Sequence, residues 1–65
     1  MHRIKDLREA KGLTQEALGA LLGVNQSTIA SWESGKKSPT LPNLVRMADY
    51  LGVTLDELMG RTAAS

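Results

Sequence analysis

The sequence of 65 residues contains no cysteine, which excludes a disulfide framework and any zinc site built on thiolates. Its one histidine, His2, stands at the N-terminus without a cysteine partner, so we expect an exposed terminal residue and no bound metal. A domain this small buries only about 60% of the surface that its unfolded chain exposes. A deep substrate cavity beside a stable core is therefore not expected, nor is a cofactor or a small-molecule ligand.

Long apolar runs are also missing. No segment approaches the roughly 20 apolar residues that cross a bilayer, and the N-terminus lacks the apolar stretch of a signal peptide. We therefore expect a soluble, cytoplasmic protein that does not bind membranes. Eight basic and seven acidic residues leave a net charge of only +1, so overall charge is a weak indicator of a nucleic-acid partner. The positions of the charges along the chain are a better indicator of such a partner than the net charge.

Glycine follows each of five segments in which apolar residues recur at helical spacing. Glycine is favoured there because it adopts the left-handed conformation that closes a helix. We predict helices over residues 2–11, 15–22, 26–34, 41–51 and 55–59. No segment alternates with a period of two, so the predicted fold class is all-α. One domain is expected over residues 1–60, with a flexible tail at 61–65.

Side chains that can cap a helix precede four of these segments. Thr14, Asn25 and Thr40 are candidate N-caps, and Thr54 with Glu57 forms a capping box. The apolar positions expected to form one core are Ile4, Leu7, Leu13, Leu18, Leu21, Leu22, Val24, Ile29, Trp32, Leu44, Met47, Ala48, Leu51, Val53, Leu55, Leu58 and Met59.

A turn of three residues, Gly23-Val24-Asn25, joins the second and third predicted helices. A turn this short that contains glycine forces a steep crossing, as in the helix-turn-helix arrangement, whose second helix can lie in the major groove of DNA. Gly19, inside the second helix, costs about 1 kcal/mol relative to alanine. We expect the close approach of the third helix at the crossing to compensate.

The outer face of the third predicted helix is short, polar and free of carboxylates. Ile29 and Trp32 are expected to face the core, which leaves five residues outward: Gln26, Ser27, Ala30, Ser31 and Ser34. Glutamine can pair with adenine N6 and N7, and serine can reach several base edges. An ordinary solvated helix face, by contrast, usually carries Lys and Glu.

Ordered motifs extend this pattern along the chain: Leu13-Thr14-Gln15-Glu16-Ala17-Leu18, Leu22-Gly23-Val24-Asn25-Gln26-Ser27-Thr28-Ile29, Trp32-Glu33-Ser34-Gly35, Pro39, Ala48-Asp49-Tyr50-Leu51-Gly52-Val53, and Leu55 to Leu58. At these spacings, over about residues 3–60, the chain resembles the phage repressor and Cro type (XRE type) of helix-turn-helix protein. The resemblance implies a compact, five-helix, lambda-repressor-like domain of bacterial or phage origin. It also implies a transcriptional regulator, in most cases a repressor, that binds an inverted-repeat operator in double-stranded DNA as a homodimer. On the family's base-reading positions fall Gln26, Ser27 and Ser31, and Ala30 can touch a thymine methyl group.

Contacts with the DNA backbone are expected on either side of these residues. Gln15 starts its helix, where free N–H groups and the helix dipole favour a phosphate. Asn25 is placed in the same way at the next helix, although it can instead simply cap that helix. The remaining phosphate candidates are Thr28, Ser34, Lys36 and Lys37.

Glu33 requires a separate explanation because a carboxylate in a reading helix would repel phosphate. We expect its charge to be turned inward and paired with Arg8, a pair that resembles a recurrent feature of the family. The role of this pair is structural. A catalytic role for Glu33 has no support, since no nucleophile, histidine or second carboxylate occupies a matching position, and an enzyme is not expected.

The last predicted helix carries apolar residues beyond the obvious demand of the core. Val53, Leu55, Leu58 and Met59 either form a dimer interface or pack inward. Two other functional classes also remain open: an antitoxin, which uses this fold to bind DNA and a toxin, and an interaction module without DNA activity.

Overall fold

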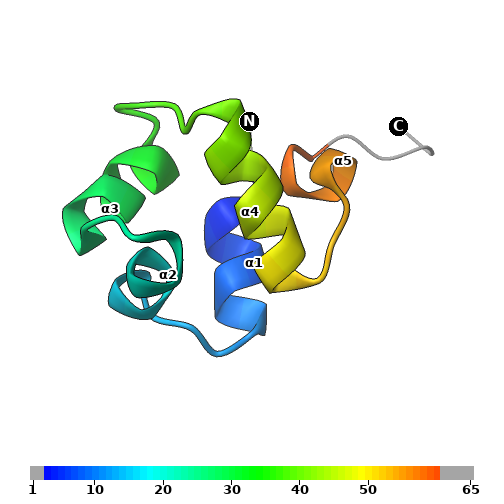
Figure 1. Ribbon diagram of the computed structural model, residues 1–65, viewed down its shortest axis with the longest axis horizontal. Helices are drawn as coiled ribbons and strands as arrows, with labels where there is room; N and C mark the ends of the chain where they lie inside the picture. Colours follow the sequence, from blue (N-terminus) through cyan, green and yellow to red (C-terminus); the bar gives the residue numbers. More distant parts are fainter. Residues whose placement is uncertain (1–2, 61–65) are drawn as a thin grey trace.

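The computed structural model describes residues 3–60 and places five helices around one core (Figure 1). They are α1 (Ile4–Ala10), α2 (Gln15–Leu22), α3 (Gln26–Ser34), α4 (Leu41–Leu51) and α5 (Leu55–Leu58). The predicted all-α, five-helix class is confirmed, and α2, α3 and α4 begin and end where the sequence predicts. The first helix begins at residue 4 rather than 2, and the first and last helices each end one residue earlier than expected, at residues 10 and 58. His2 and the expected tail at 61–65 lie outside the described residues.

Three of the four predicted N-caps are confirmed. Thr14, Thr40 and Thr54 each accept a hydrogen bond from the backbone N–H three residues on, at 3.0, 3.4 and 3.1 Å. Glu57 Oε1 in turn accepts a hydrogen bond from the backbone N–H of Thr54 at 3.0 Å, which completes the capping box. Asn25 occupies the N-cap position of α3, but its side chain makes no capping hydrogen bond, so that prediction is wrong. Its amide is therefore not held by its own helix.

The core lies between the helix-turn-helix pair, α2 and α3, and the other three helices (Figure 1). Nine buried apolar residues form it: Ile4, Leu18, Leu22, Ile29, Trp32, Met47, Ala48, Leu51 and Leu58. Packed against them and partly buried are Leu7, Leu13, Leu44, Val24, Val53 and Leu55. The prediction for Leu21 is wrong: its side chain is 41% exposed. Leu18 and Leu22, four residues apart, form the inward stripe of α2, and Leu21 lies at its solvent side.

Gly19 shows why the turn between α2 and α3 can be so tight. A Cβ atom at this position would lie only 2.7 Å from the carbonyl oxygen of Val24. The N–H of Val24 in turn donates to the carbonyl of Gly19 at 2.9 Å. The close approach predicted for Gly19 is thus confirmed, but its partner is the backbone of the turn rather than α3 itself.

Arg46 of α4 contacts the C-terminal end of α2, next to this turn. Its guanidinium donates to the carbonyl oxygens of Leu22 at 3.3 Å and Leu21 at 3.4 Å. The last carbonyls of a helix have no partner within the helix, so this contact satisfies two of them. It ties the helix-turn-helix pair to α4.

The helices are short, between 4 and 11 residues. None of those in the described part of the chain is long and apolar enough to cross a membrane. Residues 3–60 also hold no group of three His, Cys, Asp or Glu side chains placed to bind a metal ion.

Candidate nucleic-acid interface

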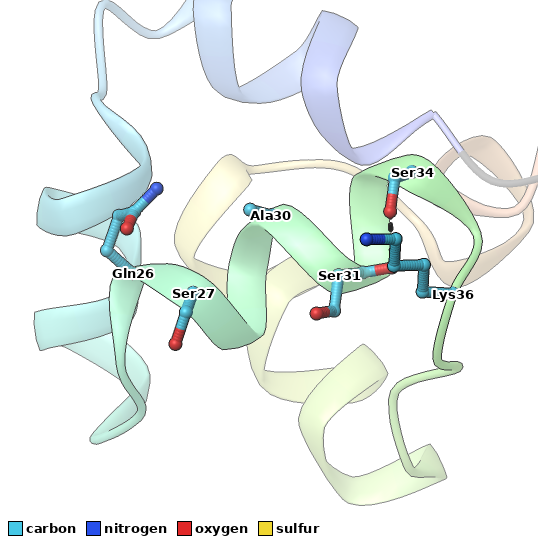
Figure 2. A pocket seen from close by; sticks show the side chains of 6 residues that line it. All are labelled: Gln26, Ser27, Ala30, Ser31, Ser34 and Lys36. Carbon is cyan, nitrogen blue, oxygen red and sulfur yellow. Dashed lines mark hydrogen bonds between the residues drawn. The ribbon is translucent and has the colours of Figure 1, made fainter.

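The outer face of α3 forms a shallow, open hollow. Figure 2 shows the six side chains that line it, with Gln26 at one end and Lys36 at the other: Gln26, Ser27, Ala30, Ser31, Ser34 and Lys36. The opposite side of the helix is anchored in the core by Ile29 and Trp32, which are 0% and 5% exposed. The predicted division of α3 into an inward and an outward face is confirmed. All four candidate base-reading residues lie in this one hollow.

Small side chains create the hollow. Its floor is serine and alanine, so an approaching surface can come close to the helix backbone. No carboxylate lines it, and its one charged side chain is the cation Lys36. Such a surface can be brought against a polyanion without charge repulsion, and the major groove is wide enough to admit a helix.

Of the candidate phosphate ligands, Ser34 and Lys36 line the hollow itself, and the other four lie outside its lining. Gln15 and Thr28 are half-buried, whereas Asn25, Ser34, Lys36 and Lys37 are exposed. Ser34 donates from its hydroxyl to the carbonyl of Ser31 at 3.2 Å (Figure 2). The N–H of Lys37 donates to that same carbonyl at 3.3 Å, which fixes the backbone from which the two lysines extend.

Arg8 and Glu33 form the predicted ion pair, and it is buried. The Arg8 Nε atom lies 2.6 Å from Glu33 Oε2 and its second nitrogen, Nη2, donates to Oε1 at 3.2 Å. The remaining nitrogen, Nη1, donates to the carbonyl of Leu13 at 2.6 Å. The side chains are only 8% and 5% exposed. The pair thus joins α1 to α3 and takes the one carboxylate of α3 out of the reading face.

The environment of Glu33 keeps it ionised. Burial raises the pKa of this carboxyl, but the hydrogen bonds from Arg8 and Gln15 outweigh burial, so its pKa falls below the ordinary value of 4.5. In the other direction, the hydrogen bond to Glu33 raises the pKa of Arg8. Both groups are therefore charged throughout the physiological pH range.

Acid is expected to destabilise the fold through Glu33. Because its pKa is lower in the folded state than in the unfolded state, the ionised carboxylate stabilises the fold above the unfolded value. That stabilisation is lost as the pH falls through the folded pKa, which places the loss below about pH 5. We expect the midpoint of thermal unfolding, followed by circular dichroism, to be level near neutral pH and to fall below about pH 5.

The matched variant for this prediction is Glu33→Gln. Near neutral pH its midpoint of thermal unfolding should be lower than that of the parent. On acidification this midpoint should fall by less than it does in the parent. A smaller acid dependence should remain, because hydrogen bonds from the backbone and hydroxyl of Thr54 also lower the pKa of Glu57. Parallel pH profiles for the variant and the parent would show that Glu33 is not the titrating group.

Two glutamines extend the ion pair to the surface, and sequence reasoning missed this contact. Gln15 donates from Nε2 to Glu33 Oε1 at 2.9 Å, and Gln26 donates from Nε2 to Gln15 Oε1 at 2.6 Å. The predictions placed Gln15 on a phosphate and Gln26 on a base, as independent contacts. The sequence did contain one sign of this contact, because each glutamine is the first residue of its predicted helix.

The four residues proposed for contact between two copies differ in exposure. Leu58 is 0% exposed and belongs to the core, so its predicted place in an interface is wrong and the inward alternative holds. Val53, Leu55 and Met59 are half-buried. The most exposed large apolar residues are instead on α4 and were not singled out: Leu41 at 62%, Tyr50 at 48% and Val45 at 45%.

Comparison with known proteins identifies relatives over nearly the whole chain. A family profile described as helix-turn-helix matches residues 4–58. The transcriptional repressor RstR of the cryptic phage CTXphi, from Vibrio cholerae, is 38% identical over 61 residues, which are 94% of this chain and 54% of that protein. The transcriptional activator BcrR of Enterococcus faecalis is 40% identical over 57 residues, 88% of this chain and 28% of that protein. The chain therefore spans about half, or less, of these curated relatives.

Solved structures show the same fold. The P22 c2 repressor, crystallised with a synthetic operator, superimposes with a TM-score of 0.80 at 32% identity, over 88% of this chain and 86% of that one. Hydroxypropylphosphonic acid epoxidase from S. wedmorenis superimposes with a TM-score of 0.79 at 38% identity. That match covers 86% of this chain but only 30% of the enzyme, so the shared part is one portion of a much larger protein.

Proposed function

Since this chain belongs to the phage repressor and Cro type of the helix-turn-helix family, we propose that it binds double-stranded DNA with α3 in the major groove and regulates transcription. The observation that carries the proposal is the hollow along α3, which is polar, floored by small side chains and free of carboxylates. The family is one of transcription regulators rather than enzymes, and the match to the epoxidase covers less than a third of that protein.

Within this proposal, four residues of the hollow read bases, and its other two, Ser34 and Lys36, hold phosphates together with residues outside the hollow. Gln26 pairs with an adenine, Ser27 and Ser31 reach other base edges, and Ala30 contacts a thymine methyl group. The phosphate ligands are Gln15, Asn25, Thr28, Ser34, Lys36 and Lys37. Base contacts carry the sequence preference, whereas phosphate contacts position the protein on the duplex.

We also propose that two copies bind an inverted repeat and repress the adjacent promoter in the cytoplasm of a bacterium. A single domain of this size buries only about 600–1,000 Å² on DNA, which limits the specificity that one copy can reach. The exposed apolar residues of α4, with Val53, Leu55 and Met59, are the candidates for contact between the copies. The proposal of repression rests on RstR and the P22 c2 protein, which are both named repressors, whereas BcrR is named an activator.

The test of the proposed function is selection of bound duplexes from a random DNA library at moderate salt. Enrichment of two inverted half-sites about one helical turn apart supports a dimeric operator reader. Enrichment of one half-site alone contradicts the homodimer while keeping the DNA-binding function. No enrichment, with binding that salt abolishes, contradicts sequence-specific recognition altogether. A promoter fusion carrying the selected site then shows whether the protein lowers or raises expression.

Gln26→Ala and Lys37→Ala are expected to weaken DNA binding in different ways. Removing the glutamine should cost about 1–3 kcal/mol on the selected site and relax the preference at one base position. Removing the lysine should weaken all sequences alike and reduce the slope of log affinity against log salt by about 0.9. Fluorescence anisotropy on matched and scrambled duplexes, over a series of salt concentrations, measures both effects. Equal behaviour of the two variants on both duplexes would contradict the assigned roles.

A further inference from the structure

We propose that Lys36 reads a guanine in the major groove, at the end of the half-site opposite the base that Gln26 contacts. On a duplex without guanine at that position, its ammonium group remains a ligand of the backbone phosphates. The inference rests on the proposed function, since it names a second base that the hollow of α3 distinguishes. It follows from the place of Lys36 in the lining of the hollow, which its neighbour Lys37 does not share.

The chain turns back on α3 immediately after the helix ends. Gly35 has a φ of +83°, a left-handed conformation that glycine adopts without strain, and its N–H donates to the carbonyl of Trp32 at 3.3 Å. The N–H of Lys37 donates to the carbonyl of Ser31 at 3.3 Å. Lys36 stands between these two hydrogen bonds, so its backbone is held beside the last turn of α3.

The side chain of Lys36 follows the hollow rather than leaving it. Figure 2 shows its ammonium group turned back along α3, toward the middle of the hollow. Lys37 is also exposed, but it is not among the residues that line the hollow. A duplex whose bases meet Ser31 therefore brings a further base edge to Lys36, which leaves Lys37 for the backbone.

The ammonium group of Lys36 is available to a base. Among the described residues, the six that line the hollow include no carboxylate that could form an ion pair with it. The hydroxyl of Ser34 donates its one hydrogen to the carbonyl of Ser31 at 3.2 Å, so it offers no donor to the acceptor atoms of a base. Lys36 is therefore the side-chain donor at its end of the hollow.

A group that only donates hydrogen bonds distinguishes guanine from adenine. A lysine ammonium has three N–H donors and no acceptor. In the major groove, guanine offers two acceptors, N7 and O6, whereas adenine offers the acceptor N7 beside a donor at N6. Lys36 can donate to both guanine atoms, but against adenine one of its donors would face the N6 amino group. Gln26 carries a donor and an acceptor, so the two ends of the hollow favour different bases.

The length of α3 sets the distance between these two bases. From Gln26 to Ser34 the helix advances by eight residues, which is about 12 Å at roughly 1.5 Å per residue. Successive base pairs are about 3.4 Å apart along the duplex. The guanine should therefore lie roughly three or four base pairs from the position that Gln26→Ala relaxes.

The test is Lys36→Gln, measured by fluorescence anisotropy on the selected site with G·C or A·T at this position. The parent should prefer guanine about tenfold, within the range of one good base contact. Glutamine pairs with adenine, so the variant should lose this preference or reverse it. An unchanged preference for guanine in Lys36→Gln would overturn the proposal, as would a parent that binds the two duplexes equally.

Lys37→Gln is the matched control, because it removes the same charge one residue away. It should lower the affinity for both duplexes alike and leave their ratio at the parent value. Lys36→Arg should keep the preference for guanine, since a guanidinium also donates to N7 and O6. Both lysines are exposed, so none of these changes should alter the midpoint of thermal unfolding. If Lys36→Gln only weakens both duplexes alike, as Lys37→Gln does, Lys36 is a phosphate ligand alone and the proposal fails.

Selection from the random DNA library separates this inference from the proposed function. Enriched half-sites that contain the guanine, and that lose it when the selection is repeated with Lys36→Gln, support both. Enriched half-sites without a guanine at that distance would overturn the role of Lys36 and leave the DNA-binding function intact. No enrichment of any site would overturn the proposed function, and this inference with it.

Discussion

Arg8→Met is expected to destabilise the domain by about 3–5 kcal/mol, because it removes the partner of a buried charge. Glu33 is 5% exposed, and without Arg8 its carboxylate would keep only the bond from Gln15. The carbonyl of Leu13 would lose its contact at 2.6 Å as well. A loss of this size is a large share of the 5–15 kcal/mol that typically separates folded from unfolded protein. Chemical denaturation of the purified variant measures it, and much of the protein should be unfolded at 37 °C.

The double variant Arg8→Met, Glu33→Met is the control. Replacing both members of a buried pair by apolar side chains of similar volume is often neutral or stabilising. The double variant should therefore be more stable than Arg8→Met. If it is equally unstable, the damage comes from lost packing or from the bond to Leu13 rather than from the unpaired carboxylate.

Gly19→Ala is expected to destabilise the domain although alanine is the better helix residue. Alanine in place of glycine should stabilise α2 by about 1 kcal/mol. Its Cβ atom, however, would meet the carbonyl oxygen of Val24 at 2.7 Å, and a backbone atom in a three-residue turn cannot move aside freely. Forced contacts of this kind typically cost about 1–3 kcal/mol and shift the backbone. Affinity for DNA should fall as well, since the turn sets the position of α3.

Ala20→Gly provides the comparison in the same helix. Ala20 is exposed, so this change should cost about the propensity difference of 1 kcal/mol and leave DNA binding unaffected. Unfolding in urea and binding to the selected duplex measure both variants. A Gly19→Ala protein more stable than the parent would show that the turn does not lie against α2 as described.

Several features of the fold follow from local rules and were predicted from the sequence. Glycine stops and threonine caps defined the bounds of α2 and α4 because both depend on residues within a few positions of each other. The inward face of α3 followed from the spacing of Ile29 and Trp32. The pairing of Arg8 with Glu33 combined the repulsion expected for a carboxylate in the reading helix with the resemblance to the family.

Other features required distances between elements, which no local pattern contains. The helical period of α2 allows either Leu21 or Leu22 to face inward. The placement of α4, whose Arg46 contacts the end of α2, decides that Leu22 is buried and Leu21 is exposed. Leu58 was ambiguous in the sequence for the same reason. A short amphipathic helix can present an apolar residue to its own core or to a second copy, and packing against α4 decides the matter.

By itself, then, the sequence determined the helical class, most helix bounds and the polar reading face. These depend on periodicity, capping and charge, which act over a few residues or within one helix. The tertiary structure alone decided that the turn backbone lies against Gly19 and that Gln15 joins Glu33 to Gln26. Both contacts depend on the crossing of α2 and α3, and a hydrogen bond forms only when two elements are placed within about 3 Å of each other.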